Sequence, residues 1–294
     1  MSTPLVFDRL LVRYRLSRAL RQGYADFLLR RVVEDMEERL STVLRPFPLA
    51  LDVGTPTPLA AEALRRSGRA EGVVRLSPVP ERGSVSGDEE RLPFAGERFD
   101  LAVSLLALQA VNDLPGALIQ IRRALKPDGL FMAALLGGST LNELRQAFTQ
   151  AEAELEGGAS PRVAPFADLR DLGGLLQRAG FALPVADSDI VRVRYADPFG
   201  LMQDLRRMGL ANALVHRRKS PLKRATLMRA AAIYAERFAD PDGRIPATFE
   251  VVWLSGWAPH ESQQKPLQPG SAKMRLADAL GVKDSPPEAA PKEK

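Results

Sequence analysis

The sequence predicts an α/β protein whose central sheet is largely parallel and covered by helices on both faces. Short apolar runs alternate with helical patterns along most of the chain, which is the order expected of βαβ units. The runs are continuously apolar rather than alternating, as expected of strands that are buried on both faces. A chain of 294 residues, 45% hydrophobic and 26% charged, is large enough to bury a sizeable core.

The first half of the chain provides most of this alternation. A helical pattern covers residues 8–44 and is followed by a predicted strand at 49–54. Thr57 suits an N-cap and Pro58 the first helical position, which opens a helix from Leu59 to Arg66. Up to residue 136 we also expect a helix at 115–125, a Lys-Pro-Asp-Gly turn at 126–129, and strands at 72–76, 99–105 and 130–136.

The second half predicts helices in front of the last strand. After a helix at 169–179, residues 190–195 alternate apolar and basic side chains, as an edge strand does. Two helical stretches, 198–209 and 222–238, separate this strand from a final strand at 248–257. The chain is therefore expected to contain an N-terminal helical cap (1–45), a main domain (46–263) with a helical insertion at about 197–245, and a disordered tail (264–294).

Composition argues against several classes of protein. No run of eighteen apolar residues is present, and arginines interrupt the N-terminal segment too often for a signal peptide. With no cysteine and two histidines, neither a disulfide framework nor a metal site is expected. A cytoplasmic location is the expectation from these features.

Basic residues are dispersed except in one stretch, and the formal net charge is +5. An acidic protein partner or a peripheral contact with an acidic membrane could use this stretch, and a solvated helix end is the structural alternative. The aromatic interleaving of a single-strand binder is missing, so we expect no nucleic acid. The basic patch consists of His216, Arg217, Arg218, Lys219, Lys223 and Arg224.

Open parallel sheets bind ligands at the carboxyl ends of their strands, where the strand order reverses. The first strand ends in Asp52-Val53-Gly54, so a site is expected there.

Several motifs carry a resemblance to a known family. Asp52-Val53-Gly54 and Leu92-Pro93-Phe94 are short pieces, whereas Val-Asn-Asp-Leu-Pro at 111–115, Gly-Gly-Ser-Thr-Leu-Asn-Glu-Leu-Arg at 137–145 and Leu-Met-Gln-Asp-Leu-Arg at 201–206 are more specific. Over residues 7–271 the chain resembles class I S-adenosylmethionine-dependent methyltransferases, and more closely the methyltransferase-like assembly factors of respiratory complex I. The resemblance implies a Rossmann-like, mostly parallel twisted sheet with an antiparallel last strand, and S-adenosylmethionine as cofactor.

The resemblance also implies which residues would hold the cofactor. Asp52 and Gly54 belong to its first loop, and Asp88 matches the acid that receives the adenine amino group, with Glu89 beside it. Ser104 ends the fourth strand beside the position of the methyl donor. A solvated acidic turn and ordinary strand packing are the structural alternatives. No catalytic residue is predicted.

Three departures weaken this cofactor site. The family's loop reads Asp-x-Gly-Cys-Gly-x-Gly, whereas here Pro56 and Pro58 remove backbone donors and forbid a positive φ. Arg75 stands near the end of the second strand, where the family places an acid for the ribose hydroxyls. The absence of this acid should weaken the binding free energy of the cofactor by about 1.5–3 kcal/mol. Gln109 and Ala110 replace the frequent His-Trp pair, so a potential general base is missing.

Three functions follow as hypotheses. The first is a protein with an eroded S-adenosylmethionine site and weakened or lost activity, which binds a partner such as a complex I subunit and assists assembly. The second is a working enzyme on a protein substrate, by methyl transfer or by the arginine hydroxylation ascribed to the mitochondrial branch. The third is a small-molecule methyltransferase whose substrate pocket uses the helical insertion.

Overall fold

The computed structural model describes residues 5–264. The described residues up to His260 belong to one compact unit, and the boundary to a second unit falls after His260. The tail expected at 264–294 therefore lies, apart from its first residue, outside the described residues. The division of the chain into cap, main domain and tail stays a prediction.

The core of the first unit is a seven-stranded sheet in the order β3-β2-β1-β4-β5-β7-β6. Neighbours from β3 to β5 pair in parallel, whereas β7 pairs antiparallel with both β5 and β6. The predicted mostly parallel sheet with an antiparallel last strand is confirmed. The strands are β1 (Phe47–Val53), β2 (Ala70–Ser77), β3 (Val85–Ser86), β4 (Phe99–Leu105), β5 (Leu125–Leu136), β6 (Ala182–Tyr195) and β7 (Ile245–Trp257).

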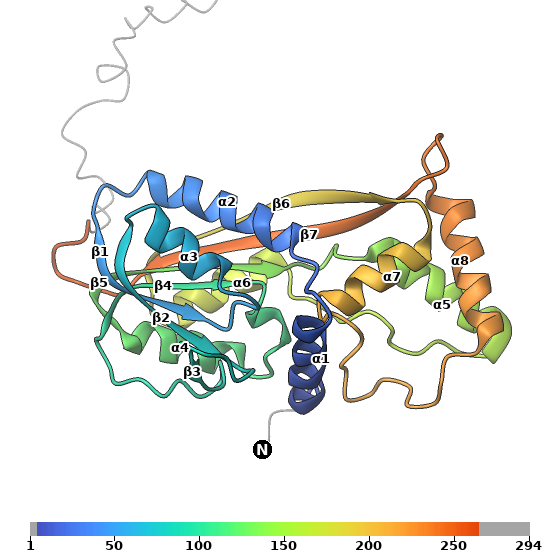
Figure 1. Cartoon of the computed structure of the whole chain (residues 1–294), viewed down its shortest axis with the longest axis horizontal. Helices are drawn as coiled ribbons and strands as arrows, with labels where there is room; N and C mark the ends of the chain where they lie inside the picture. The colour runs from blue at the N-terminus through green and yellow to red at the C-terminus, as the bar shows by residue number, and fades with distance from the viewer. Residues whose placement is uncertain (1–4, 265–294) are drawn as a thin grey trace, which may run out of the picture. The chain divides into compact units, whose positions relative to one another are not determined.

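Helices cover both faces of this sheet (Figure 1). One apolar cluster joins the sheet to α2 and α3, and a second joins the opposite face to α4 and α6. Successive residues of β4 alternate between the clusters, with Leu101 and Val103 in the first and Ala102 in the second. The helices are α1 (Arg9–Arg21), α2 (Phe27–Ser41), α3 (Leu59–Arg66), α4 (Leu114–Ala124), α5 (Asn142–Glu156), α6 (Leu169–Arg178), α7 (Pro198–Arg207) and α8 (Arg224–Phe238).

Three local predictions need correction, and one helix was not predicted. The helical pattern at 8–44 is broken into α1 and α2, with Gly23 at φ +86° between them. Pro58, not Thr57, is the N-cap of α3, and its backbone is already helical. The turn at 126–129 is part of the start of β5, where the carbonyl of Gly129 accepts a hydrogen bond from the backbone N–H of Ala258. Helix α5 was not expected, although its buried Leu144, Ala147, Phe148 and Ala151 have helical spacing.

The N-terminal helix reaches the carboxyl ends of the parallel strands. Figure 1 shows α1 between the sheet and the group formed by α5, α7 and α8. Phe7, just before α1, forms an antiparallel bridge with Leu214 in the segment between α7 and α8. The helical insertion between β6 and β7 therefore meets the N-terminal segment beside the expected site.

Candidate functional site

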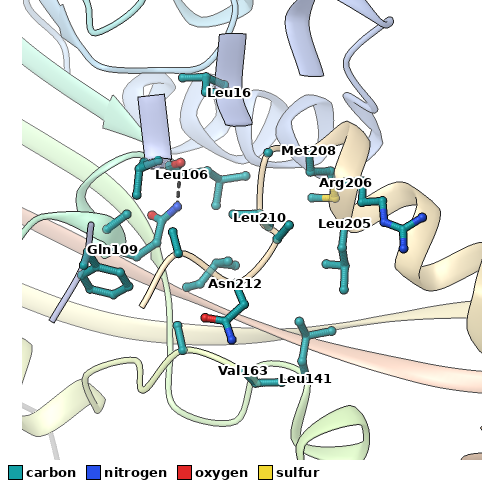
Figure 2. Close-up of a pocket in the computed structure, with 18 of the residues that line it drawn as sticks. Leu16, Leu106, Gln109, Leu141, Val163, Leu205, Arg206, Met208, Leu210 and Asn212 are labelled. Atoms are coloured by element: carbon teal, nitrogen blue, oxygen red, sulfur yellow. Dashed lines mark hydrogen bonds between the residues drawn. The ribbon is translucent and has the colours of Figure 1, made fainter. Parts of the chain in front are cut away.

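A cavity of about 310 Å³ lies where the candidate site was expected. Gly54, Pro56 and Glu89 line it near the end of β1, and most of the remaining wall comes from α1, α5, α7 and the segments after β4, α5 and α7. Figure 2 shows that most of the labelled side chains around it are apolar. Among the labelled residues these include Leu16, Leu106, Leu141, Val163, Met208 and Leu210.

The carboxylate at the end of β1 is paired with the arginine that replaces the expected ribose acid. Asp52 is fully buried, and its Oδ2 accepts a hydrogen bond of 3.1 Å from Arg75 Nε. The two residues are partners in the β1–β2 register. Burial raises the pKa of Asp52 to about 6, although Arg75 acts in the opposite direction. Arg75 also donates to the carbonyl of Thr55 (3.1 Å) and to Glu81 (2.5 Å), so it connects the loop after β1 to the segment after β2.

The glycine retained from the family's loop is in contact with an acidic side chain. Gly54 has φ +73°, and a Cβ placed on it would lie 2.5 Å from Glu89 Oε1. A side chain at position 54 would therefore clash with Glu89 as well as strain the backbone. Next to it, Thr55 is buried and its hydroxyl accepts the backbone N–H of Leu105 at 3.2 Å.

Two arginines of α1 bind Asp88, which the resemblance assigns to adenine, and Glu89 beside it. Arg9 binds both Asp88, at 2.8 Å, and Glu89. Arg13, one turn further along α1, also binds Asp88. Arg9 additionally donates to the carbonyl of Ala110 at 3.0 Å. These four residues form the α1 clamp: Arg9, Arg13, Asp88 and Glu89.

The two acids of the α1 clamp respond differently to their surroundings. Burial raises the pKa of Glu89, and the opposing effect of Arg9 does not compensate. Burial also acts to raise the pKa of Asp88, but the backbone N–H of Glu90 and the charge of Arg9 outweigh it, so that this pKa is lowered. Glu89 is thus the member that depends most on its arginine to stay ionised.

The remaining predicted residue lies inside β4, and Gln109 lies after that strand in a short 3-10 helix, Leu108–Ala110. Ser104 is fully buried and donates to the carbonyl of Val53 at 2.7 Å, which joins β4 to β1. Gln109 donates to the carbonyl of Leu106 at 2.7 Å (Figure 2), while its Oε1 has no hydrogen-bond partner among the described atoms.

Of the five residues predicted to bind the cofactor, Gly54 and Glu89 line the cavity, whereas Asp52, Asp88 and Ser104 are not among its lining residues. Their cofactor role stays a prediction. Arg9 and Arg13 were missed, because their partners are about 80 residues away and no local pattern connects them.

The basic patch is largely tied into the fold. Arg217 binds Asp8 at 3.3 Å, and Arg218 and Lys223 both bind the buried carboxylate of Glu156 at the end of α5. Glu156 accepts hydrogen bonds from Thr226 and Arg218, which together lower its pKa to about 2. Half of the patch therefore has structural partners. The exposed members of the patch that form no ion pair among residues 5–264 are His216, Lys219 and Arg224.

Replacing Arg217 and Arg218 together with glutamate should therefore destabilise the protein. The new carboxylates would face Asp8 and Glu156, and like charges at contact repel. We expect the midpoint of thermal unfolding at pH 7 to fall by a few degrees or more, since roughly 1 kcal/mol corresponds to about 2–4 °C in a chain of this size. Lys219→Glu, at an exposed position, is the matched control and should leave the midpoint unchanged. Equal midpoints for both variants would show that the ion pairs are screened by solvent.

No helix among residues 5–264 combines the length and the apolarity needed to cross a bilayer.

Comparison with known proteins identifies the family. The model of a methyltransferase domain matches residues 51–133. Proteins named arginine-hydroxylase NDUFAF5, mitochondrial, from Danio rerio and Homo sapiens are each 42% identical to this chain, cover 93% of it, and are themselves covered over 89% and 83% of their lengths. A malonyl-acyl-carrier protein O-methyltransferase of a Methylovorus strain is 36% identical over 86% of this chain and 90% of its own.

Solved structures agree in fold. A putative methyltransferase of Bacillus halodurans superposes with a TM-score of 0.52 at 15% identity, over 77% of this chain and 98% of its own. The YcgJ protein of Bacillus subtilis gives 0.53 at 14% identity, over 79% and 99%. At these identities the likeness concerns the fold alone.

Proposed function

Because the chain belongs to the class I methyltransferase-fold family and is related to the assembly factors of respiratory complex I, we propose that it assists complex I assembly as a binding protein without methyl transfer. Its cofactor site would then bind S-adenosylmethionine weakly or not at all. The partner would be a protein, a complex I subunit being the candidate. A peripheral contact with an acidic membrane and a cytoplasmic location remain predictions.

One observation carries this proposal: the chain's own arginines engage the acids of the site. Arg75 pairs with Asp52 at the position where an acid for the ribose would stand, and the α1 clamp binds the two acids next to the adenine position. A nucleoside would have to compete with charge-assisted hydrogen bonds that are already formed in a buried setting. It would also meet Glu89 directly above Gly54.

A second candidate function is an active enzyme that acts on a protein. The relatives that are 42% identical are named arginine-hydroxylases, which favours it. Methyl transfer itself needs little from side chains beyond positioning, so the missing general base does not argue against it. What argues against it is the same set of ion pairs, because any reaction with this cofactor requires the site to bind it.

Titration with S-adenosylmethionine and S-adenosylhomocysteine separates the two candidates. A ligand that binds only the folded protein stabilises it by RT ln(1 + [L]/Kd), which is about 2.7 kcal/mol at a hundredfold excess over Kd. We expect no shift of the thermal midpoint of the full chain at 1 mM of either compound, while an active methyltransferase of the same fold, run in parallel, shifts upward. A shift already at micromolar concentration would overturn the proposed loss of binding and favour the enzyme.

A further inference from the structure

We propose that the cavity between α1 and α7 binds an anionic amphiphile, meaning a molecule with one long apolar chain and one carboxylate or phosphate head. The inference rests on the proposed function in one respect, namely that a nucleoside does not hold this space. It concerns the remainder of the cavity, away from Gly54 and Glu89.

The walls of the cavity suit an apolar chain. Apolar side chains from α1, from the segment after β4, from the start of α5 and from the end of α7 converge on it. The same two helices, α1 and α7, also supply the charged lining residues Arg9, Arg13 and Arg206. Pockets of this kind bind ligands by burying apolar surface, and a few polar groups at the edge fix the ligand's orientation. The apolar residues from these four elements include Val12, Leu16, Leu106, Leu144, Leu205 and Met208.

The charged residues around the cavity favour a negative head. Four arginines and one acid line it, and the acid, Glu89, is already bound by Arg9. Arg13 and Arg162 are bound by Asp88 and Glu152. Arg206 is exposed at the rim of the cavity, where its guanidinium points outward from the apolar side chains in Figure 2, and no ion pair joins it to another residue of the range 5–264.

The same charges disfavour a cationic ligand. An incoming guanidinium or ammonium would approach the four arginines and would find no uncommitted carboxylate among the residues that line the cavity. Like charges at close range raise the free energy of the complex. An arginine side chain is therefore a poor occupant of this cavity, whereas a fatty-acid carboxylate or a lipid phosphate that stays at the rim would lie beside Arg206.

Displacement of a fluorescent fatty acid, dansylundecanoic acid, from the full chain tests the inference. All competitors are kept below their critical micelle concentrations. We expect dodecanoate or dodecyl phosphate to displace the probe at micromolar concentration. Dodecylamine, with the same chain and the opposite charge, should be at least about tenfold weaker, a difference of about 1.4 kcal/mol. If the two anions differ, the stronger one identifies the head as a fatty-acid carboxylate or a lipid phosphate.

Three single substitutions test whether the amphiphile binds in this cavity. Arg206→Glu should weaken the anions about tenfold and reduce the preference over dodecylamine. Arg82→Glu makes the same charge change in an exposed turn outside the cavity and should have no effect. Val163→Trp, which fills the cavity from the opposite wall, should weaken all the long-chain competitors, the amine included.

The inference is overturned if the probe does not bind, if dodecylamine equals dodecanoate, or if Arg82→Glu acts like Arg206→Glu. These outcomes are independent of the S-adenosylmethionine titration. A protein that binds both the cofactor and the amphiphile would contradict only the proposed function. A protein that binds neither would contradict only the inference drawn here.

Discussion

Replacing Arg75 with methionine is expected to lower the free energy of unfolding by about 3–5 kcal/mol at pH 7, because it leaves the carboxylate of Asp52 buried without its counter-ion. Both side chains are almost completely inside the protein, with 5% of Arg75 and none of Asp52 exposed. Methionine keeps much of the length of the arginine stem, so the loss reports the charge rather than a cavity. Urea unfolding of the wild type and the variant measures it.

The effect of this substitution should depend on pH in a defined direction. Burial already raises the pKa of Asp52 to about 6 in the folded wild type, above the ordinary value of 3.8. Removing Arg75, which acts to lower that pKa, raises it further in the variant. A raised pKa means that the folded state prefers the protonated acid, so the stabilisation is present at low pH and is lost as the pH rises.

The deficit of Arg75→Met relative to the wild type is therefore expected to be largest above pH 7 and to shrink as the pH falls toward 6, below which both folded proteins carry a neutral Asp52. Adding Asp52→Asn to the variant should recover part of the lost stability at pH 7. A deficit that stays constant between pH 5 and 8 would contradict the role given to Asp52.

The sequence predicted the fold well where turn or capping residues and apolar runs indicate the same helix or strand. Strand β4 was placed at its observed bounds, because residues 99–105 form a mostly apolar run that is buried on both faces. Helix α3 was also predicted at its observed bounds, Leu59 to Arg66, and only its N-cap was one residue off, because Pro58 can serve either as the N-cap or as the first helical residue. The helical pattern at 8–44 did not predict the turn between α1 and α2, which allows α1 to lie across the strand ends.

The candidate site was predictable in position and not in content. The end of β1 and the unusual loop could be located from the family's motifs, and Arg75 was noticed as a departure. Its role was not predictable, since a phosphate contact and an ion pair with Asp52 look alike in a sequence. The α1 clamp depends on residues that become neighbours only when α1 packs against the segment after β3, so only the tertiary structure connects them.

The second large effect is expected at Arg9, the residue of the α1 clamp that binds both acids. Its side chain is 14% exposed and that of Glu89 is 4% exposed, so Arg9→Met leaves an acid buried without a partner. The expected cost is about 3–5 kcal/mol at pH 7. Arg13→Met is the matched control: Arg13 is 35% exposed and binds only Asp88, which is itself 24% exposed, so its loss should cost about 1 kcal/mol or less.

Two further measurements assign the loss at Arg9 to Glu89. Burial holds the pKa of Glu89 above its ordinary 4.5, and removing Arg9 raises it further, so the deficit of Arg9→Met should shrink as the pH falls and Glu89 takes up a proton. Arg9→Met combined with Glu89→Gln should regain most of the stability at pH 7, because a neutral amide replaces the stranded charge. Equal and small losses for the Arg9 and Arg13 variants would mean that solvent screens the whole clamp. In that case the acids beside Gly54 would be accessible to a nucleoside after all, and the case for a site closed by its own arginines would rest on Arg75 alone.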